Sequence, residues 1–277
     1  MIDLARPQPL LAELCAIALA AGEAILEVYG REFAVQLKSD RSPLTEADEV
    51  AHRIIGERLR ALDGSVPVLS EESAPPDAAT RRAWRRFWLV DPLDGTKEFL
   101  KRNGEFTVNI ALVEEGRAVL GVVSAPALGR LYYGALGAGA WRRDGAGDAK
   151  PIHVRTPAAE PPRVVGSRSH PSGELADYLA VLGPHEITPM GSSLKFCLVA
   201  EGAADVYPRF GPTSEWDTAA AQAILESAGG RMIDRVGRPL RYNTKDDLLN
   251  PHFLAFGDTR RNWLAPTQKT RGPEDRY

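Results

Sequence analysis

Residues 88–113 read WLVDPLDGTKEFLKRNGEFTVNIALV. The apolar residues at the start predict a strand, and Asp91 and Asp94 follow it directly with a proline between them. Asp, Pro and Gly are common in turns after strands, so the backbone alone would be explained by a turn. A turn does not explain why two carboxylates lie so close together, because their like charges raise the cost of ionising both unless a cation compensates. This stretch therefore indicates a strand whose end carries acidic ligands.

Composition limits the classes of protein to consider. The chain has 277 residues, of which 44% are hydrophobic, enough for one large domain or two closely packed ones. Lys and Arg number 34 against 37 Asp and Glu, a net charge of -3, so there is no general basic field for nucleic-acid binding. Cys15 and Cys197 form neither a disulfide framework nor a metal-ligand spacing, which is typical of a reducing compartment.

One segment is apolar enough to be tested as a membrane span. Residues 10–30, LLAELCAIALAAGEAILEVYG, are interrupted by Glu13 and Glu23, and their aliphatic side chains recur at helical spacing. This pattern predicts an amphipathic helix of a folded protein rather than an integral membrane segment. We expect a cytoplasmic protein, with peripheral association at the inner membrane left open.

The pattern of elements changes near the middle of the chain. The first half predicts helices and a mainly antiparallel sheet, including a hairpin in which FTVNIALV and AVLGVVS flank the turn EEGR. After the proline-rich residues 156–163, TPAAEPPR, short strands alternate with helices. We therefore expect a mixed α/β (α+β) protein with an N-terminal domain at residues 1–157 and a C-terminal domain at residues 158–277.

Four carboxylates stand where they could converge. Asp91 and Asp94 leave one strand, Glu71 follows a second short strand in LSEES, and Asp217 precedes the last long helix. Mg²⁺ prefers oxygen ligands, usually a few carboxylates with waters and substrate phosphate. The backbone carbonyl of Leu93, between the two aspartates, is available as a further oxygen. The pattern predicts a site for two metal ions.

Most of these acids also have a structural explanation when considered alone. Asp217 at a helix N-terminus would favour the helix dipole, and Asp48, three residues after Thr45, fits a capping box. Glu71 alone is typical of a solvated surface. The run Asp-Pro-Leu-Asp-Gly-Thr is the hardest to explain by structure only.

Gly95 and Thr96 suggest what the metals act on. Glycine lets the backbone approach a ligand closely, and the N–H groups that open a helix through KEFL would form an anion site beside the metals. Two cations that bridge a phosphate ester activate a water and stabilise the leaving alkoxide. The chemistry predicted is in-line hydrolysis of a phosphomonoester, without a serine, cysteine or histidine nucleophile.

These motifs resemble a known family. DPLDGTKEF, SEES, SPLTEAD and EWDTAA...AGG have the order and approximate spacing seen in the inositol monophosphatase superfamily of Mg²⁺-dependent, lithium-sensitive phosphatases. Longer runs, among them GSSLKFCLVAEGAADVYPRFGPTSEWDTAA, resemble its bacterial 3'(2'),5'-bisphosphate nucleotidases. The resemblance implies a layered αβαβα sandwich with the active site between its halves. It also implies hydrolysis of adenosine 3',5'-bisphosphate (PAP) to AMP and phosphate, with PAPS as a second substrate, in sulfur metabolism.

The resemblance assigns roles to individual residues. Asp48 and Thr96 resemble the pair that activates the attacking water, with Glu71 beside them in catalysis. Ala221 departs from the family, which usually has glycine there, and we expect the extra methyl group to affect metal affinity. The ligands of two or three Mg²⁺ ions would be Glu71, Asp91, the Leu93 carbonyl, Asp94 and Asp217, and the scissile phosphate would lie against Asp94, Gly95, Thr96 and Asp217.

Substrate choice should depend on the second half of the chain, because a bisphosphate carries a second anionic group. Lys195 and Arg209 are candidates to bind it, together with Ser192 and Ser193 near a helix start. His170 is a weaker candidate for the sugar or adenine. The structural alternatives are a solvated helix residue for Lys195 and a surface ion pair for Arg209.

Two other functions remain open at this point. The metal site does not select the alcohol, so inositol or sugar monophosphates are alternative substrates. A non-catalytic nucleotide or metal sensor with the same fold is the second, although the complete ligand set argues against it. The expected partner is a small nucleotide bisphosphate and not a nucleic acid, while the sequence leaves the oligomeric state open.

Overall fold

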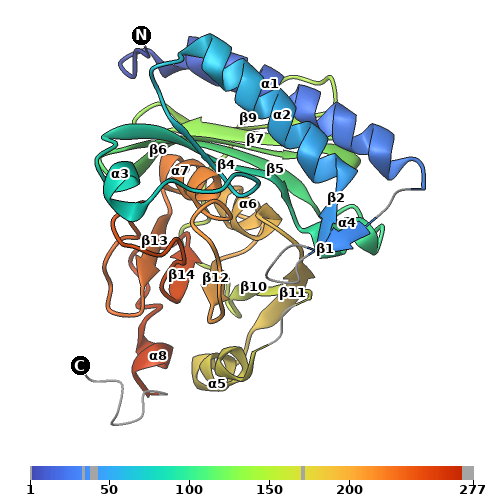
Figure 1. Cartoon of the computed structure of the whole chain (residues 1–277). Helices are drawn as coiled ribbons and strands as arrows, with labels where there is room; N and C mark the ends of the chain where they lie inside the picture. The colour runs from blue at the N-terminus through green and yellow to red at the C-terminus, as the bar shows by residue number, and fades with distance from the viewer. Residues whose placement is uncertain (1, 33–34, 38–42, 170–171, 270–277) are drawn as a thin grey trace.

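The structure is a computed structural model that describes residues 2–32, 35–37, 43–169 and 172–269. Its helices and sheets form five layers, in the order helix, sheet, helix, sheet, helix (Figure 1). The mixed α/β layered sandwich expected from the sequence is confirmed.

The first layer consists of α1 (Pro7–Tyr29) and α2 (Glu46–Leu62), which lie on one face of the larger sheet (Figure 1). By length and composition alone, α1 could cross a membrane, but 50% of its most apolar window is buried inside the protein. Its buried side chains belong to one cluster with those of α2 and of the sheet. This is the amphipathic core helix that the sequence predicts.

The larger sheet has seven strands in sequence order, so each strand lies beside its neighbour in the chain. The first two strands are parallel and all the others pair antiparallel. Its central strands are covered on both faces, and accordingly every residue of β5 except the last is buried. The strands are β3 (Val68–Ser70), β4 (Arg86–Asp94), β5 (Thr107–Glu114), β6 (Arg117–Ala125), β7 (Arg130–Ala135), β8 (Gly139–Asp144) and β9 (Lys150–Pro151).

The middle layer contains α6 (Leu194–Ala200) and α7 (Ala219–Ser227), between the two sheets (Figure 1). Helix α7 lies close to β6 because Gly121 has no side chain: a Cβ there would lie 2.0 Å from the carbonyl oxygen of Ala220. Ala221 is buried within α7 at 1% exposure. Its effect on metal affinity stays a prediction.

The second sheet has five strands in the order β11, β10, β12, β14, β13. Strand β10 pairs in parallel with β11 and with β12, and the remaining pairs are antiparallel. Helices α5 (Gly173–Leu182) and α8 (Ala265–Lys269) form the last layer (Figure 1). The strands are β10 (Arg163–Ser167), β11 (Glu186–Met190), β12 (Val206–Arg209), β13 (Arg231–Asp234) and β14 (Phe253–Phe256).

The shorter elements lie around the edges of the sheets. Strands β1 (Val35–Leu37) and β2 (Pro43–Thr45) form an antiparallel pair, and η1 (Pro126–Leu128) is a turn of 3-10 helix. The short helices α3 (Ala78–Arg82) and α4 (Thr96–Leu100) flank β4 in the chain. One hydrophobic cluster includes side chains of both sheets and of α7. The division into domains at residues 1–157 and 158–277 stays a prediction.

Candidate active site

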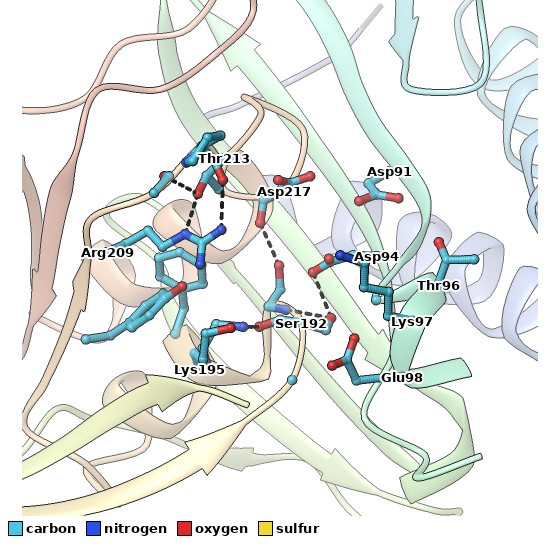
Figure 2. Close-up of a pocket in the computed structure, with 18 of the residues that line it drawn as sticks. Asp91, Asp94, Thr96, Lys97, Glu98, Ser192, Lys195, Arg209, Thr213 and Asp217 are labelled. Atoms are coloured by element: carbon cyan, nitrogen blue, oxygen red, sulfur yellow. Dashed lines mark hydrogen bonds between the residues drawn. The ribbon is translucent and has the colours of Figure 1, made fainter. Parts of the chain in front are cut away.

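The site begins at the carboxyl end of β4. The pairing of β4 with β5 is irregular between Asp91 and Asp94, so the strand departs from regular register where the two carboxylates occur. Asp91 is 1% exposed, and its Oδ1 accepts a hydrogen bond of 3.0 Å from the N–H of Leu93. The strand ending in acidic side chains, predicted from the sequence, is present (Figure 2).

Two further carboxylates reach the same place from other elements. Glu71 directly follows β3, and because β3 and β4 are parallel their carboxyl ends meet at one edge of the sheet. Asp217 lies just before α7, where its Oδ2 accepts a 2.9 Å hydrogen bond from the N–H of Ser214. One carboxylate oxygen each from Glu71, Asp91 and Asp217 lie within 4.8 Å of one another.

The electrostatics of this cluster favour a bound cation. Burial, and then the charges of Glu71, Asp94 and Asp217, raise the pKa of Asp91 well above its usual range. Burial, followed by Asp94 and Glu71, does the same to the pKa of Asp217. Buried like charges are costly unless a cation compensates, and a set of carboxylate oxygens suits a hard divalent ion. The residues present therefore fit a metal such as Mg²⁺.

The backbone turns sharply beyond the carboxylates. Gly95 has a φ of 89°, a left-handed conformation that glycine adopts without strain, and it precedes the first residue of α4. A Cβ at this position would lie 3.2 Å from the carbonyl oxygen of Glu105 and from the Cβ of Ser192. The hydroxyl of Thr96 donates a 3.4 Å hydrogen bond to the carbonyl of Leu93. The helix predicted through KEFL is thus confirmed, and it begins two residues after Asp94.

A cavity of about 620 Å³ opens over these residues and is lined by both halves of the chain. It joins the carboxylates to Lys195 and Arg209, which lie on the opposite side (Figure 2). His170 lies outside the described residues. The cavity is lined by all the other predicted metal and substrate residues: Glu71, Asp91, Leu93, Asp94, Gly95, Thr96, Ser192, Ser193, Lys195, Arg209 and Asp217.

Lys195 is not the solvated helix residue of the structural alternative. It is 7% exposed, and its Nζ donates a 2.5 Å hydrogen bond to the carbonyl of Ser192. The same Nζ lies 5.4 Å from the ring centroid of Tyr207. Burial lowers the pKa of Lys195 to about 8, although the charge of Asp94 opposes the shift. A buried ammonium in the wall of this cavity is a suitable group to bind a phosphate.

Ser192 and Ser193 connect this side to the carboxylates. The hydroxyl of Ser192 donates to Oδ2 of Asp94 at 2.7 Å, and the hydroxyl of Ser193 donates to the carbonyl of Asp217 at 2.6 Å. Ser193 occupies the N-cap position of α6, although its side chain accepts no capping hydrogen bond from the described residues, so both serines lie at a helix start, as the sequence predicts. Here they contact the residues of the acidic cluster.

Arg209 is held by its own loop. Its Nε donates to the hydroxyl of Thr213 at 2.6 Å and its Nη2 to the carbonyl of Pro212 at 2.7 Å (Figure 2). Within the described residues Arg209 forms no ion pair with a carboxylate, so the surface ion pair considered above is not found there. These contacts orient the guanidinium along the wall of the cavity.

Asp48 occupies the capping position predicted for it. Its Oδ2 accepts hydrogen bonds from the backbone N–H of Thr45 at 2.7 Å and from the Thr45 hydroxyl at 2.6 Å, at 1% exposure. The capping box at the start of α2 is therefore confirmed. Asp48 is not among the residues that line the cavity, and its catalytic role stays a prediction.

Sequence reasoning missed Glu98 as a cavity residue. This side chain is 4% exposed, and its carboxylate accepts a short hydrogen bond from Ser169. It lies on the same wall as Asp94 (Figure 2). In the sequence it resembles an ordinary surface residue of a short helix, and only its place two residues after Thr96 could have indicated otherwise.

Comparisons with known proteins agree on one family. A sequence profile of the Inositol monophosphatase family matches residues 6–264. The 3'(2'),5'-bisphosphate nucleotidase CysQ of Salmonella typhimurium is 54% identical over 246 residues, covering 88% of this chain and 98% of that protein. The CysQ of Escherichia coli (strain K12) is 53% identical over the same shares. A crystal structure of CysQ from Bacteroides thetaiotaomicron, a bacterial member of the family, gives a TM-score of 0.77 at 43% identity, covering 91% of this chain and 98% of that one.

Proposed function

Because the chain belongs to the inositol monophosphatase family, we propose that it is a phosphatase that hydrolyses adenosine 3',5'-bisphosphate to AMP and phosphate. One observation carries this proposal: a single cavity has an acidic cluster on one side and two cationic side chains, Lys195 and Arg209, on the other. A substrate with two separate phosphates fits such a charge distribution. The names of the relatives, 3'(2'),5'-bisphosphate nucleotidases, support the same substrate class.

Mg²⁺ is the cofactor we propose, in two or three sites. Glu71, Asp91, Asp94 and Asp217 would hold it through carboxylate oxygens, and Leu93 through its carbonyl. When bound, such an ion lowers the pKa of a water and offsets charge that develops on the phosphoryl oxygens. Lithium inhibition belongs to this proposal too, because Li⁺ would compete for the same oxygens.

The residues of the chain prepare the scissile phosphate for attack. The N–H groups after Gly95 offer donors to the phosphate oxygens, since the glycine lets the backbone come close. Thr96, held at the carbonyl of Leu93, and the buried carboxylate of Asp48 would orient the attacking water and accept its proton. The hydroxyl of Ser192 fixes Asp94 in place.

Lys195 and Arg209 would bind the remote phosphate. Lys195 is buried, so it has little water to lose when the anion arrives, and Arg209 is already oriented by Thr213 and Pro212. PAPS carries an anionic group on the same side, and we propose it as a second substrate. The cellular role proposed is removal of the by-product of sulfate assimilation in the cytoplasm.

A phosphate-release assay tests the proposal. It compares adenosine 3',5'-bisphosphate, inositol 1-phosphate and fructose 1,6-bisphosphate, each with and without Mg²⁺. We expect the highest kcat/KM for the nucleotide bisphosphate and no turnover without the metal. A higher kcat/KM for inositol 1-phosphate would show that the proposed substrate is wrong and would favour an inositol monophosphatase. No release from any of the three would indicate a non-catalytic sensor.

A further inference from the structure

A carboxylate outside the cavity joins the two halves of the chain directly behind the site. Glu105 lies in the loop between α4 and β5, its side chain is 13% exposed, and it does not line the cavity. Its two oxygens accept hydrogen bonds of 2.7 Å each from Nε and Nη2 of Arg168. Oε2 also accepts a 2.8 Å hydrogen bond from the backbone N–H of Gly191. We call Glu105, Arg168 and Gly191 the Glu105 clasp.

The Glu105 clasp holds the carboxyl ends of two parallel strands. Arg168 follows β10, and its guanidinium also donates a 2.9 Å hydrogen bond to the carbonyl of Pro189 in β11. Gly191 comes directly after β11. Glu105 therefore fixes both strand ends of the second sheet against a loop of the first half. A bidentate Arg–carboxylate pair is among the more rigid contacts that side chains make.

Gly191 packs too tightly against the first half to carry a side chain. A Cβ at this position would lie 2.7 Å from the carbonyl oxygen of Glu105, 2.7 Å from Cγ of Glu98 and 2.9 Å from Cβ of Glu105. The backbone of Gly191 is thus confined by packing against Glu98 and Glu105 and is also held by the hydrogen bond from its N–H to Glu105. The restricted backbone of Gly191 also restricts the position of the next residue in the chain.

That next residue is Ser192, which has a φ of 52°. A left-handed conformation is costly for a residue other than glycine and persists only where the surroundings impose it. In this conformation the hydroxyl of Ser192 bonds Asp94 at 2.7 Å and the hydroxyl of Thr107 at 2.5 Å. Its carbonyl accepts from Lys195 at 2.5 Å. Ser192 therefore orients one residue on each side of the cavity.

We infer that Glu105 is a positioning residue of the active site, which holds Ser192 through Gly191 and so fixes Asp94 and Lys195 relative to each other. This inference rests on the proposed function for the roles of those two residues. Partners that orient metal ligands typically contribute about 10- to 100-fold to metal affinity or activity. Glu105→Ala should therefore lower both kcat/KM for the nucleotide bisphosphate and Mg²⁺ affinity by about that factor.

Glu201→Ala is a matched control. Glu201 is 11% exposed, pairs with Arg142 at 2.8 Å and also joins α6 to the larger sheet, but it does not line the cavity. If the Glu105 clasp only supports the fold, both variants should lower the unfolding midpoint and neither should alter Mg²⁺ affinity. We expect Mg²⁺ affinity, measured by calorimetry without substrate, to fall in Glu105→Ala only.

A double-mutant cycle tests the route through Ser192. In a Ser192→Ala background, Glu105→Ala should change Mg²⁺ affinity and kcat/KM by no more than about twofold, because the contact that it supports is already gone. The inference would be overturned if the losses of the two single variants multiplied in the double variant. It would also be overturned by wild-type Mg²⁺ affinity in Glu105→Ala, or by an equal loss of Mg²⁺ affinity in Glu201→Ala. If Glu105→Ala does not fold, Arg168→Ala removes the same ion pair from its more exposed side and takes its place in the cycle.

Failure of the proposed function and failure of the inference about Glu105 give different results in these experiments. A wild-type protein that releases no phosphate from the bisphosphate would refute the proposed function only. The Glu105 clasp would still be decided by Mg²⁺ affinity in the Glu105→Ala and Glu201→Ala variants, since that measurement needs no substrate.

Discussion

Lys195→Met should separate stability from activity. The substitution keeps an unbranched side chain of similar length and removes the charge from a site that is 7% exposed. Burial lowers the pKa of Lys195 from 10.5 to about 8, so the folded, unliganded protein holds this charge at a cost of about 3 kcal/mol, an upper bound. The substitution also removes the hydrogen bond to Ser192, which offsets about 1 kcal/mol of the expected gain in stability. The net expectation at pH 7 is a metal-free protein that is about 1–2 kcal/mol more stable.

The pH dependence follows from the direction of the shift. Below pH 8 both the folded and the unfolded chain carry the proton on Lys195, and the cost of burying the charge is present in full. Between pH 8 and 10.5 the unfolded chain binds more protons, so the contribution of Lys195 to unfolding free energy rises with pH. Lys195→Met should lack this rise. Lys150→Met, on the exposed strand β9, is the control that should keep it.

The same variant should lose activity selectively. A hydrogen bond to a charged group contributes about 1.5–3 kcal/mol, so kcat/KM for adenosine 3',5'-bisphosphate should fall roughly 10- to 150-fold. Hydrolysis of a small monophosphate should change little, because that substrate has no remote phosphate. The assay measures kcat/KM for both substrates, and urea unfolding at pH 7 and pH 10 in wild type and both variants. Equal losses on the two substrates, or a destabilised Lys195→Met at pH 7, would refute the reasoning.

Four further predictions concern the metal ligands and the packing. Asp94→Asn should lower kcat by orders of magnitude with the fold intact, and near-normal turnover would remove Asp94 from the metal site. Asp48→Asn keeps an oxygen that can accept the hydrogen bond from Thr45, so thermal stability should be nearly unchanged, while loss of the proposed base should lower kcat about 10²–10⁴-fold. A variant that loses stability but keeps its activity would leave Asp48 only the capping role. Li⁺ titrated at fixed Mg²⁺ should inhibit at sub-millimolar to millimolar levels, and indifference up to roughly tens of millimolar would count against the site. Gly121→Ala should lower unfolding free energy by about 1–3 kcal/mol in urea, because its Cβ would overlap Ala220, whereas Gly173→Ala has open space and should not.

The carboxylate side of the site was predictable because its signals are local. Asp91, Asp94 and Gly95 occur within five consecutive positions, after a strand that its apolar residues identify. Parallel pairing of β3 with β4 then brings Glu71 to the same edge. The mixture of helices and strands followed from the apolar patterns, and the layered arrangement followed from the family resemblance.

The contacts between the halves could not be predicted in the same way. Glu105 is 63 residues from Arg168 and 86 from Gly191 in the chain, and nothing in its local sequence distinguishes it from a surface acid. From the sequence, a solvated helix residue remained the alternative to a phosphate-binding role for Lys195, but α6 lies between two sheets (Figure 1) and all its residues except Leu198 are buried. Burial of this kind depends on which segments pack against the helix, and those segments are distant in the sequence.

This difference bears on how reaction class and substrate can each be predicted from the sequence. Most of the residues proposed for phosphate ester hydrolysis lie in one short motif and at the ends of two neighbouring strands, and Asp217 joins them from just before α7. The cations opposite them depend on how α6 and β12 are placed across the cavity, and on Ser192, which follows Gly191 and so lies next to the contact of Gly191 with Glu105 of the first half. Changes in the middle layer could therefore alter substrate choice without touching Asp91 or Asp94. We therefore expect the substrate preference of this chain to depend on Lys195 and Arg209 more than on residues 91–96.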